Sequence, residues 1–225
     1  ASKPGKTSMK FFIKLTATLL LLIASISALA YFFWYKPKFN TKISTTTFTA
    51  NKDAAAKNTL ARLKLKTTGI SEYAKEHGYN STYCFMVDMK IESGKKRFFV
   101  YNLKTDSIEL SGLVTHGSGK IQSNEIQFSN TANSLCTSLG RYKIGNSYTG
   151  KFGLAFKLYG LDNTNSNAFN RFVVLHAHAC VPNEETAPFP ICESWGCPTV
   201  APAFLQELKT YIDQSERPIL LFIYY

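Results

Sequence analysis

Acidic side chains are almost absent from the first 66 residues of this 225-residue chain. That stretch holds one acid, Asp53, against twelve lysines and arginines, whereas residues 67–225 hold fourteen residues of each sign. The formal charge of +11 therefore belongs to the N-terminal segment, and the rest of the chain is neutral. A nucleic-acid-binding domain carries its positive charge on its own surface, so this distribution argues against a nucleic-acid partner.

Charged residues are missing altogether between Leu15 and Tyr35. A helix of these 21 residues would be roughly 30 Å long, which is the thickness of a bilayer core. Lysines precede the segment and the aromatic run YFFWY ends it, where aromatic rings favour the membrane interface. We interpret residues 15–35 as a transmembrane signal anchor. Because residues 28–30 (ALA) resemble a signal-peptidase site, a cleaved signal peptide is the alternative. Both place the rest of the chain outside the cytoplasm.

The cysteines cannot all pair with one another, because their number is odd: Cys84, Cys136, Cys180, Cys192 and Cys197. Thiols of exported proteins tend to form disulfides, so at least one is left over. Cys180 and Cys192 flank the proline-rich loop VPNEETAPFPI and could close it, and Cys84 with Cys136 is another possible pair. If the first pair forms, Cys197 is the free thiol in the most constrained local sequence, SWGCP.

Internal repeats are lacking too. From Tyr83 onward, short apolar runs separated by turn signals predict β-strands. These runs are YCFMVDMKI, KRFFVYNL, IELSGLVTH, GRYKIGNSYTGK, FGLAFKLYG, RFVVLHAHACV and PILLFIYY. Apolar residues at helical spacing predict one helix among them, over residues 201–214. The basic run Lys95-Lys96-Arg97 is interpreted as a solvated hairpin turn. The sequence thus predicts a mainly β fold, largely antiparallel, with flanking helices.

The chain divides into five predicted segments. Good helix formers predict short helices over residues 51–66 and 70–78, and a Thr-rich polar stretch predicts a linker before them. The segments are a basic N-terminal tail at 1–14, the membrane segment at 15–35, a linker at 36–50, a helical lead at 51–80 and a β-rich domain at 81–225.

Histidine is scarce, and two of the four histidines lie in the run RFVVLHAHAC. On a strand, His176, His178 and Cys180 would point to one face. An imidazole beside Cys197 can take the thiol proton and so produce a nucleophilic thiolate. Gly196 lets a backbone approach closely, and the amides of Gly196 and Cys197 could stabilise an oxyanion. The pattern indicates a Cys/His site.

The pairing of VVLHAHACV with SWGCPTV resembles the L,D-transpeptidases that remodel bacterial peptidoglycan, in the branch with Ser-Trp-Gly-Cys-Pro in place of Ser-His-Gly-Cys. The similarity extends through YNLKTDSIELSGLVTHGSGK, FSNTANSLCTSLGRYKIGNSYTGKFGLAFKLYGLD, NAFNRFVVLH and the terminal LLFIYY. It covers roughly residues 60–225. It implies an L,D-transpeptidase-like β-sandwich over residues 81–225, in a protein of the bacterial cell envelope, periplasmic or extracytoplasmic and held in the inner membrane by residues 15–35.

The resemblance also implies roles for individual residues. Cys197 matches the nucleophile, His176 the general base and Gly196 the turn that offers backbone donors. The residues that match or flank the substrate cleft are His116, Tyr148, His178, Ser194 and Trp195. His178 is additional to the family pattern and could share the role of base. Ala177 and Trp195 depart from the family's more common glycine and histidine.

The implied reaction uses no cofactor. A thioester forms on the cysteine as D-Ala leaves a tetrapeptide stem of peptidoglycan, and the amine of a second stem then gives a 3→3 crosslink. Three alternatives remain. Water as the acceptor would make the protein an L,D-carboxypeptidase, and a degenerate site would make it a membrane-tethered wall-binding module. A zinc site of His176, His178 and Cys180 with Cys192 or Cys197 is also stereochemically conceivable.

Overall fold

The computed structural model describes residues 6–36, 45–120 and 125–225, and for residues 6–13 and 45–56 it describes the backbone alone. The parts of the predicted basic tail and linker at residues 1–5 and 37–44 lie outside the described residues. The chain separates into two units, residues 1–58 and 59–225.

In the first unit, α1 (Lys6–Ala30) continues into the π-helical turn η1 (Tyr31–Tyr35). Within the described residues, Lys14–Tyr35 is the one helical stretch long and apolar enough to cross a membrane, and none of it is buried. A signal sequence has the same length and composition, so both interpretations of residues 15–35 fit this helix.

Helix α3 (Thr45–Glu76) is one continuous helix, where two short helices were predicted. It begins inside the predicted linker, so residues 45–50 are helical. Residues 67–69 (TTG), which lie between the two predicted helices, are poor helix formers. Leu63, Ile70 and Ala74 nevertheless form one buried stripe against the sheet, and such packing outweighs local propensity.

The second unit is built on one eight-stranded sheet with the order β3-β2-β1-β8-β4-β5-β6-β7. Neighbouring strands are antiparallel except β1–β8 and β6–β7, which are parallel, so the sheet is mixed. The prediction of a mainly β fold with flanking helices is confirmed. The strands are β1 (Tyr83–Asp88), β2 (Phe98–Asn102), β3 (Ser107–Gly112), β4 (Gly140–Gly150), β5 (Gly153–Gly160), β6 (Val174–Ala177), β7 (Thr199–Val200) and β8 (Leu220–Tyr224).

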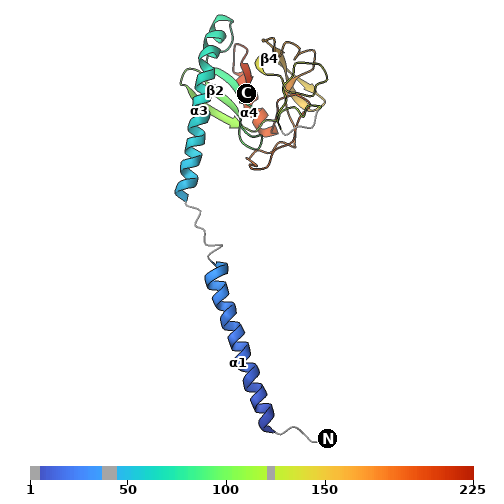
Figure 1. Ribbon diagram of the computed structural model, residues 1–225. Helices are drawn as coiled ribbons and strands as arrows, with labels where there is room; N and C mark the ends of the chain where they lie inside the picture. Colours follow the sequence, from blue (N-terminus) through green and yellow to red (C-terminus); the bar gives the residue numbers. More distant parts are fainter. Residues whose placement is uncertain (1–5, 37–44, 121–124) are drawn as a thin grey trace. The chain divides into compact units, whose positions relative to one another are not determined.

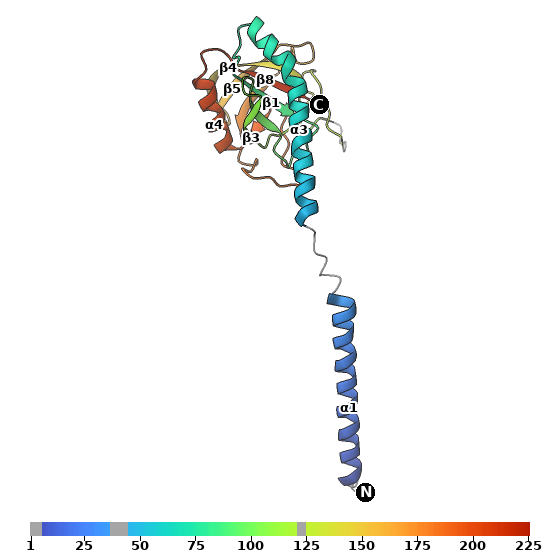
Figure 2. The same ribbon diagram turned by 90° about the vertical axis from the view of Figure 1, so that its left-hand side faces the viewer.

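Two helices cover opposite faces of the first half of this sheet, as Figures 1 and 2 show. Because strand side chains alternate between faces, Cys84 and Met86 of β1 pack in the apolar cluster under α3. Phe85 and Val87 pack in the larger cluster on the other face, under α4 (Pro202–Asp213). The helix predicted over residues 201–214 is therefore confirmed.

The basic run before β2 was predicted to be solvated, and for Arg97 this is wrong. Its side chain is fully buried, and its guanidinium donates to the carbonyl of Val114 (3.0 Å from Nε) and that of Ile91 (3.1 Å). The desolvation lowers its pKa to about 10, while Asp88 opposes the shift. A buried arginine is tolerated when its donors are satisfied, and here backbone carbonyls and the imidazole of His116 satisfy them.

Candidate active site

The turn that carries Cys197 is closed by Ser194. The Ser194 hydroxyl donates to the carbonyl of Cys197 (2.7 Å) and accepts from the amide of Gly196 (3.2 Å). Gly196 has φ +111, and a Cβ atom there would lie 2.6 Å from the carbonyl oxygen of Cys136. Only glycine fits at this position without displacing backbone. Ser194 therefore shapes the turn from within.

His176 lies on β6 and is 7% exposed. Its Nδ1 is 3.1 Å from the carbonyl oxygen of Ala177, which can only accept, so Nδ1 carries the proton. In the neutral ring Nε2 is then an acceptor, and it lies 3.0 Å from the hydroxyl of Thr199. These two bonds fix both the orientation and the tautomer of the imidazole.

The parallel register of β6 and β7 brings His176 and Cys197 together. It pairs His176 with Thr199, two residues after Cys197. The Thr199 hydroxyl contacts the imidazole and also lies 3.4 Å from the Cys197 carbonyl. In the described structure the thiol does not bond to the ring directly: Cys197 Sγ accepts from the amide of Val174 (3.5 Å) and donates to the carbonyl of Phe172 (3.8 Å).

Both groups are uncharged at neutral pH. Burial raises the pKa of the Cys197 thiol, and the Val174 amide and the charge of Arg171 oppose that rise. Burial lowers the pKa of His176; the bond to Ala177 opposes the change and the neighbouring His178 adds to it. The arrangement is a neutral thiol beside a neutral imidazole, which can act as a base.

The prediction that His176, His178 and Cys180 share a strand face is wrong for Cys180. Strand β6 ends at Ala177, the His178 amide still donates to the Val200 carbonyl (3.1 Å), and the chain turns at residues 179–180. His176 is buried whereas His178 is exposed, and His178 Nδ1 accepts from the amide of Cys180 (3.1 Å). Both imidazoles nevertheless contact the ring of Phe152, at 5.1 Å for His176 and 5.9 Å for His178.

Cys180 and Cys192 form a disulfide that closes the proline-rich loop, one of the pairings that the sequence left open. Cys84 and Cys136 are free and buried, and Cys197 is free and partly exposed. A disulfide cysteine cannot ligate zinc, so the alternative zinc site loses two of its candidate ligands. No group of three His, Cys, Asp or Glu side chains among the described residues could hold a metal ion.

His116 flanks the turn on the side away from β6. Its carbonyl accepts from the amide of Ser194 (2.9 Å), and its Nδ1 accepts from Arg97 (3.0 Å). Nε2 therefore carries the proton and faces Glu193 at 3.5 Å. Burial and the charge of Arg97 lower the pKa of His116 to about 4, so its contact with Glu193 is no ion pair at neutral pH.

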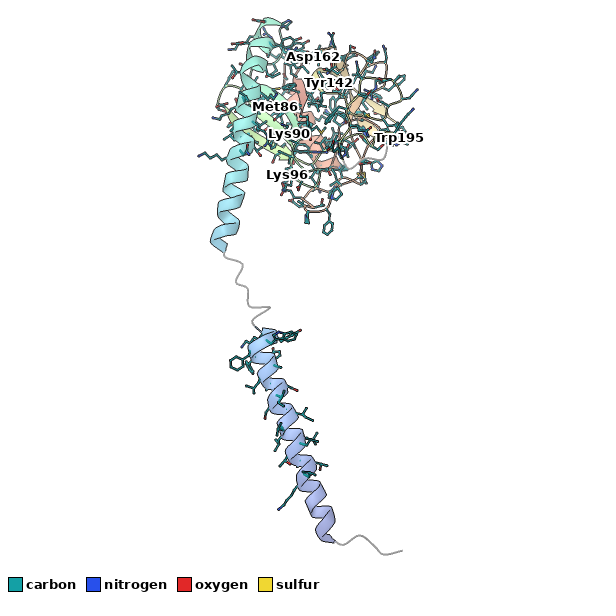
Figure 3. The ribbon with its side chains drawn as sticks, viewed as in Figure 1. Met86, Lys90, Lys96, Tyr142, Asp162 and Trp195 are labelled. Atoms are coloured by element: carbon teal, nitrogen blue, oxygen red, sulfur yellow. A yellow bond between two sulfur atoms is a disulfide. The ribbon has the colours of Figure 1, made fainter. Side chains whose placement is uncertain are left out.

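Tyr148 lies in one cross-strand row with His176. The registers pair Tyr148 with Ala155 and Ala155 with His176, so the two side chains point to the same face of the sheet. Trp195 is 81% exposed at the periphery of this unit (Figure 3). Of the predicted cleft residues, Tyr148, Trp195 and His178 are exposed.

Several residues of this site were missed from the sequence. Thr199 contacts the imidazole, Phe152 stacks on it, and Arg171 lies behind the turn. The threonine and the phenylalanine lie inside quoted motifs, CPTV and TGKFG, but neither residue type points to chemistry by itself. For Arg171 the available signal was a charge placed directly before a buried strand.

Comparisons with solved structures give distant likenesses. The Ldtfm-avibactam carbamoyl enzyme is 13% identical with a TM-score of 0.38, over 64% of this chain and 49% of that one. The helical cell shape determining protein Pgp2 from Campylobacter jejuni is 10% identical with a TM-score of 0.41, over 63% and 47%. An L,D-transpeptidase from Xylanimonas cellulosilytica is 14% identical with a TM-score of 0.36, over 68% of each chain. The chain thus spans about half the length of the first two, at 49% and 47%.

No curated protein matches the chain. The family comparison is decisive, because residues 54–224 match the L,D-transpeptidase catalytic domain. This range contains the whole sheet, the turn at Cys197 and His176. The chain belongs to the L,D-transpeptidase catalytic domain family.

Proposed function

We propose that the protein is a peptidoglycan L,D-transpeptidase in which Cys197 is the nucleophile and His176 the general base. The observation that carries the proposal is the β6–β7 register, which brings the buried imidazole beside Thr199 and the thiol two residues away. Family membership supplies the reaction class.

In the proposed reaction the Thr199 hydroxyl turns from Nε2 of His176 to the Cys197 carbonyl, which frees the nitrogen lone pair. The thiol leaves the Phe172 carbonyl and passes its proton to Nε2 as the sulfur attacks the stem carbonyl. Apo enzymes often hold such pairs apart, and the contact tightens when substrate binds. The carbonyl π electrons move to oxygen and form a tetrahedral oxyanion. His176 then returns the proton to the leaving amine of D-Ala, and a thioester to Cys197 remains.

The oxyanion requires hydrogen-bond donors near the sulfur. The Gly196 amide already donates to Ser194, so it is engaged in the resting turn. The Cys197 amide has no hydrogen-bond acceptor within the described part of the chain. We therefore assign the Cys197 amide as the principal donor, with Gly196 contributing only if Ser194 releases it.

The stem peptide is proposed to bind over the face that carries Tyr148 and His176, with Trp195 and His178 at its rim. The first pair shares a sheet row, and the second pair is exposed. His116 would contact substrate as a neutral donor through Nε2, because its Nδ1 is engaged by Arg97.

The proposed location is the bacterial cell envelope, with residues 15–35 as the membrane anchor. The apolar stretch Lys14–Tyr35 supports an anchor. The Cys180–Cys192 disulfide supports an oxidising compartment, since such bonds persist outside the cytosol.

The test is mass spectrometry of disaccharide-tetrapeptide muropeptides incubated with the full chain in detergent. Loss of D-Ala with new 3→3 dimers is expected, and Cys197→Ala should abolish both. Tripeptides without dimers would instead make the protein an L,D-carboxypeptidase. An unchanged profile from folded protein that still sediments with peptidoglycan would make it a wall-binding module.

A further inference from the structure

Arg171 lies behind the nucleophile turn and is held by neutral oxygens. Its Nη1 donates to the Ser129 carbonyl (2.8 Å) and the Ser138 hydroxyl (2.7 Å). Its Nη2 donates to the Ser134 hydroxyl (3.2 Å) and the Cys136 carbonyl (2.7 Å). One guanidinium thus donates hydrogen bonds to four residues of segment 129–138.

The same guanidinium lies next to the turn. A Cβ atom on Gly196 would lie 3.3 Å from Nη2 of Arg171 and 2.6 Å from the carbonyl oxygen of Cys136. Segment 129–138 therefore packs against the backbone immediately before Cys197, with Arg171 at the junction. Loss of the Arg171 guanidinium would therefore loosen both segment 129–138 and the turn.

The charge of Arg171 is not neutralised by a neighbouring acid. Among the described residues Arg171 takes part in no ion pair, whereas Arg62 pairs with Asp88 and Arg141 pairs with Asp162. A cation solvated by carbonyls and hydroxyls keeps its full charge, and in a partly buried site that charge acts more strongly than in water.

Three other titratable groups around Cys197 are neutral at pH 7, and the fourth is an exposed carboxylate. Tyr142 of β4 donates to the Ser138 carbonyl (2.7 Å), and burial raises its pKa to about 12. His176 of β6 and His116 beyond the turn both have lowered pKa values. The carboxylate of Glu193 is exposed and faces His116.

We propose that Arg171 is a positioning residue of this site, which holds segment 129–138 against the turn and stabilises negative charge on the sulfur of Cys197. The inference rests on the proposed role of Cys197 as nucleophile. Arg171 supplies a fixed positive charge. This charge lowers the free energy needed to form a thiolate in a buried place, because a nearby cation favours the charged form of an acid.

The experiment measures the rate at which iodoacetamide alkylates Cys197 in the full chain, as a function of pH, with peptide mass spectrometry to separate Cys197 from Cys84 and Cys136. The midpoint of the profile reports the pKa of the Cys197 thiol, independently of the intrinsic nucleophilicity of the sulfur. In Arg171→Gln we expect the midpoint to rise by about one pH unit, a tenfold loss of thiolate at a fixed pH below it. Arg171→Lys should restore more than half of the shift. Arg141→Gln, which removes a charge already paired with Asp162, should leave the midpoint unchanged.

A second pair of variants keeps Arg171 in place. Ser134→Asp adds a carboxylate beside Nη2 and should raise the midpoint, while the isosteric Ser134→Asn should not. Equal midpoints in Ser134→Asp and Ser134→Asn, or a shift in Arg171→Gln that Arg171→Lys fails to reduce, would overturn the inference. Because alkylation needs no muropeptide, a failure of the proposed reaction would be seen separately.

Discussion

In β1 every side chain from Cys84 to Asp88 is buried, whereas in the turn from Ser194 to Cys197 exposure changes from residue to residue. The strand is held by apolar contacts on both faces, which come from its position in the middle of the sheet. The turn is held by hydrogen bonds of Ser194 and by a glycine packed against the Cys136 carbonyl. The difference teaches that stability and chemistry depend on separate groups of residues here. A substitution in one group should therefore impair stability or reactivity without impairing the other.

The two histidines of the HAH motif give the largest expected contrast. His176→Ala should lower muropeptide turnover about a thousandfold, because a positioned general base contributes roughly 10²–10⁴. His178→Ala should change it less than about threefold, since His178 is exposed and bonded to the Cys180 amide. Steady-state kinetics on purified muropeptides distinguish the two. Equal losses would show that His178 shares the role of base.

On the apolar side, Leu63→Ala should lower the free energy of unfolding by about 3 kcal/mol, because it opens a cavity in the cluster between α3 and the sheet. Leu65→Ala on the same helix should change it by less than about 0.5 kcal/mol, since Leu65 is 79% exposed. Denaturant unfolding measures both. If Leu63→Ala also slowed Cys197 alkylation in the folded protein, the separation of stability from chemistry would fail.

On the turn side, Gly196→Ala should cost about 2 kcal/mol, since its φ of +111 and the Cys136 carbonyl both oppose a side chain. Gly78→Ala is the matched control, with φ +72 and no atom within 4 Å of the added carbon. It should cost about 1 kcal/mol and leave alkylation of Cys197 unchanged. A Gly196→Ala protein with wild-type stability and alkylation would contradict the turn geometry.

The smallest expected effect is the acid response of His116. Its pKa falls from the ordinary 6.5 to about 4 on folding, so between these values the unfolded chain binds more protons. The contribution of His116 to the free energy of unfolding is therefore complete above pH 6.5 and is lost as the pH falls toward 4. We expect a loss on the order of 1–2 kcal/mol, reduced because the group is partly exposed. His116→Gln should flatten the difference in unfolding free energy between pH 7 and pH 4, and an unchanged slope would argue against a depressed pKa.

Most of the fold could be predicted because short apolar runs bounded by turn residues mark buried strands such as β1 and β2. The strand β7 was missed because its two residues, Thr199 and Val200, are too few to show a period. The burial of Arg97 depends on carbonyls far away in sequence, which no local pattern contains. The same is true of Arg171, whose partners are 33 to 42 residues away.

Within the site, Cys197 and His176 could be named from the sequence as candidates because their residue types and spacing suggest chemistry. The strand face for Cys180 was predicted wrongly, because where a strand ends depends on the pairing partner. Strand β7 begins at Thr199 and pairs only His176 and Ala177. Beyond that pairing the chain turns, and the disulfide takes Cys180 out of the chemistry.

The most direct measurement is to find the acyl group on the enzyme. The full chain would be mixed briefly with tetrapeptide muropeptides, quenched in acid and digested. The mass of the peptide that contains Cys197 would then be measured by mass spectrometry. We predict that it carries the stem minus D-Ala as a hydroxylamine-sensitive thioester, and that Cys197→Ala carries nothing. An active enzyme with Cys197 unmodified, or with the adduct on Cys84 or Cys136, would contradict the account.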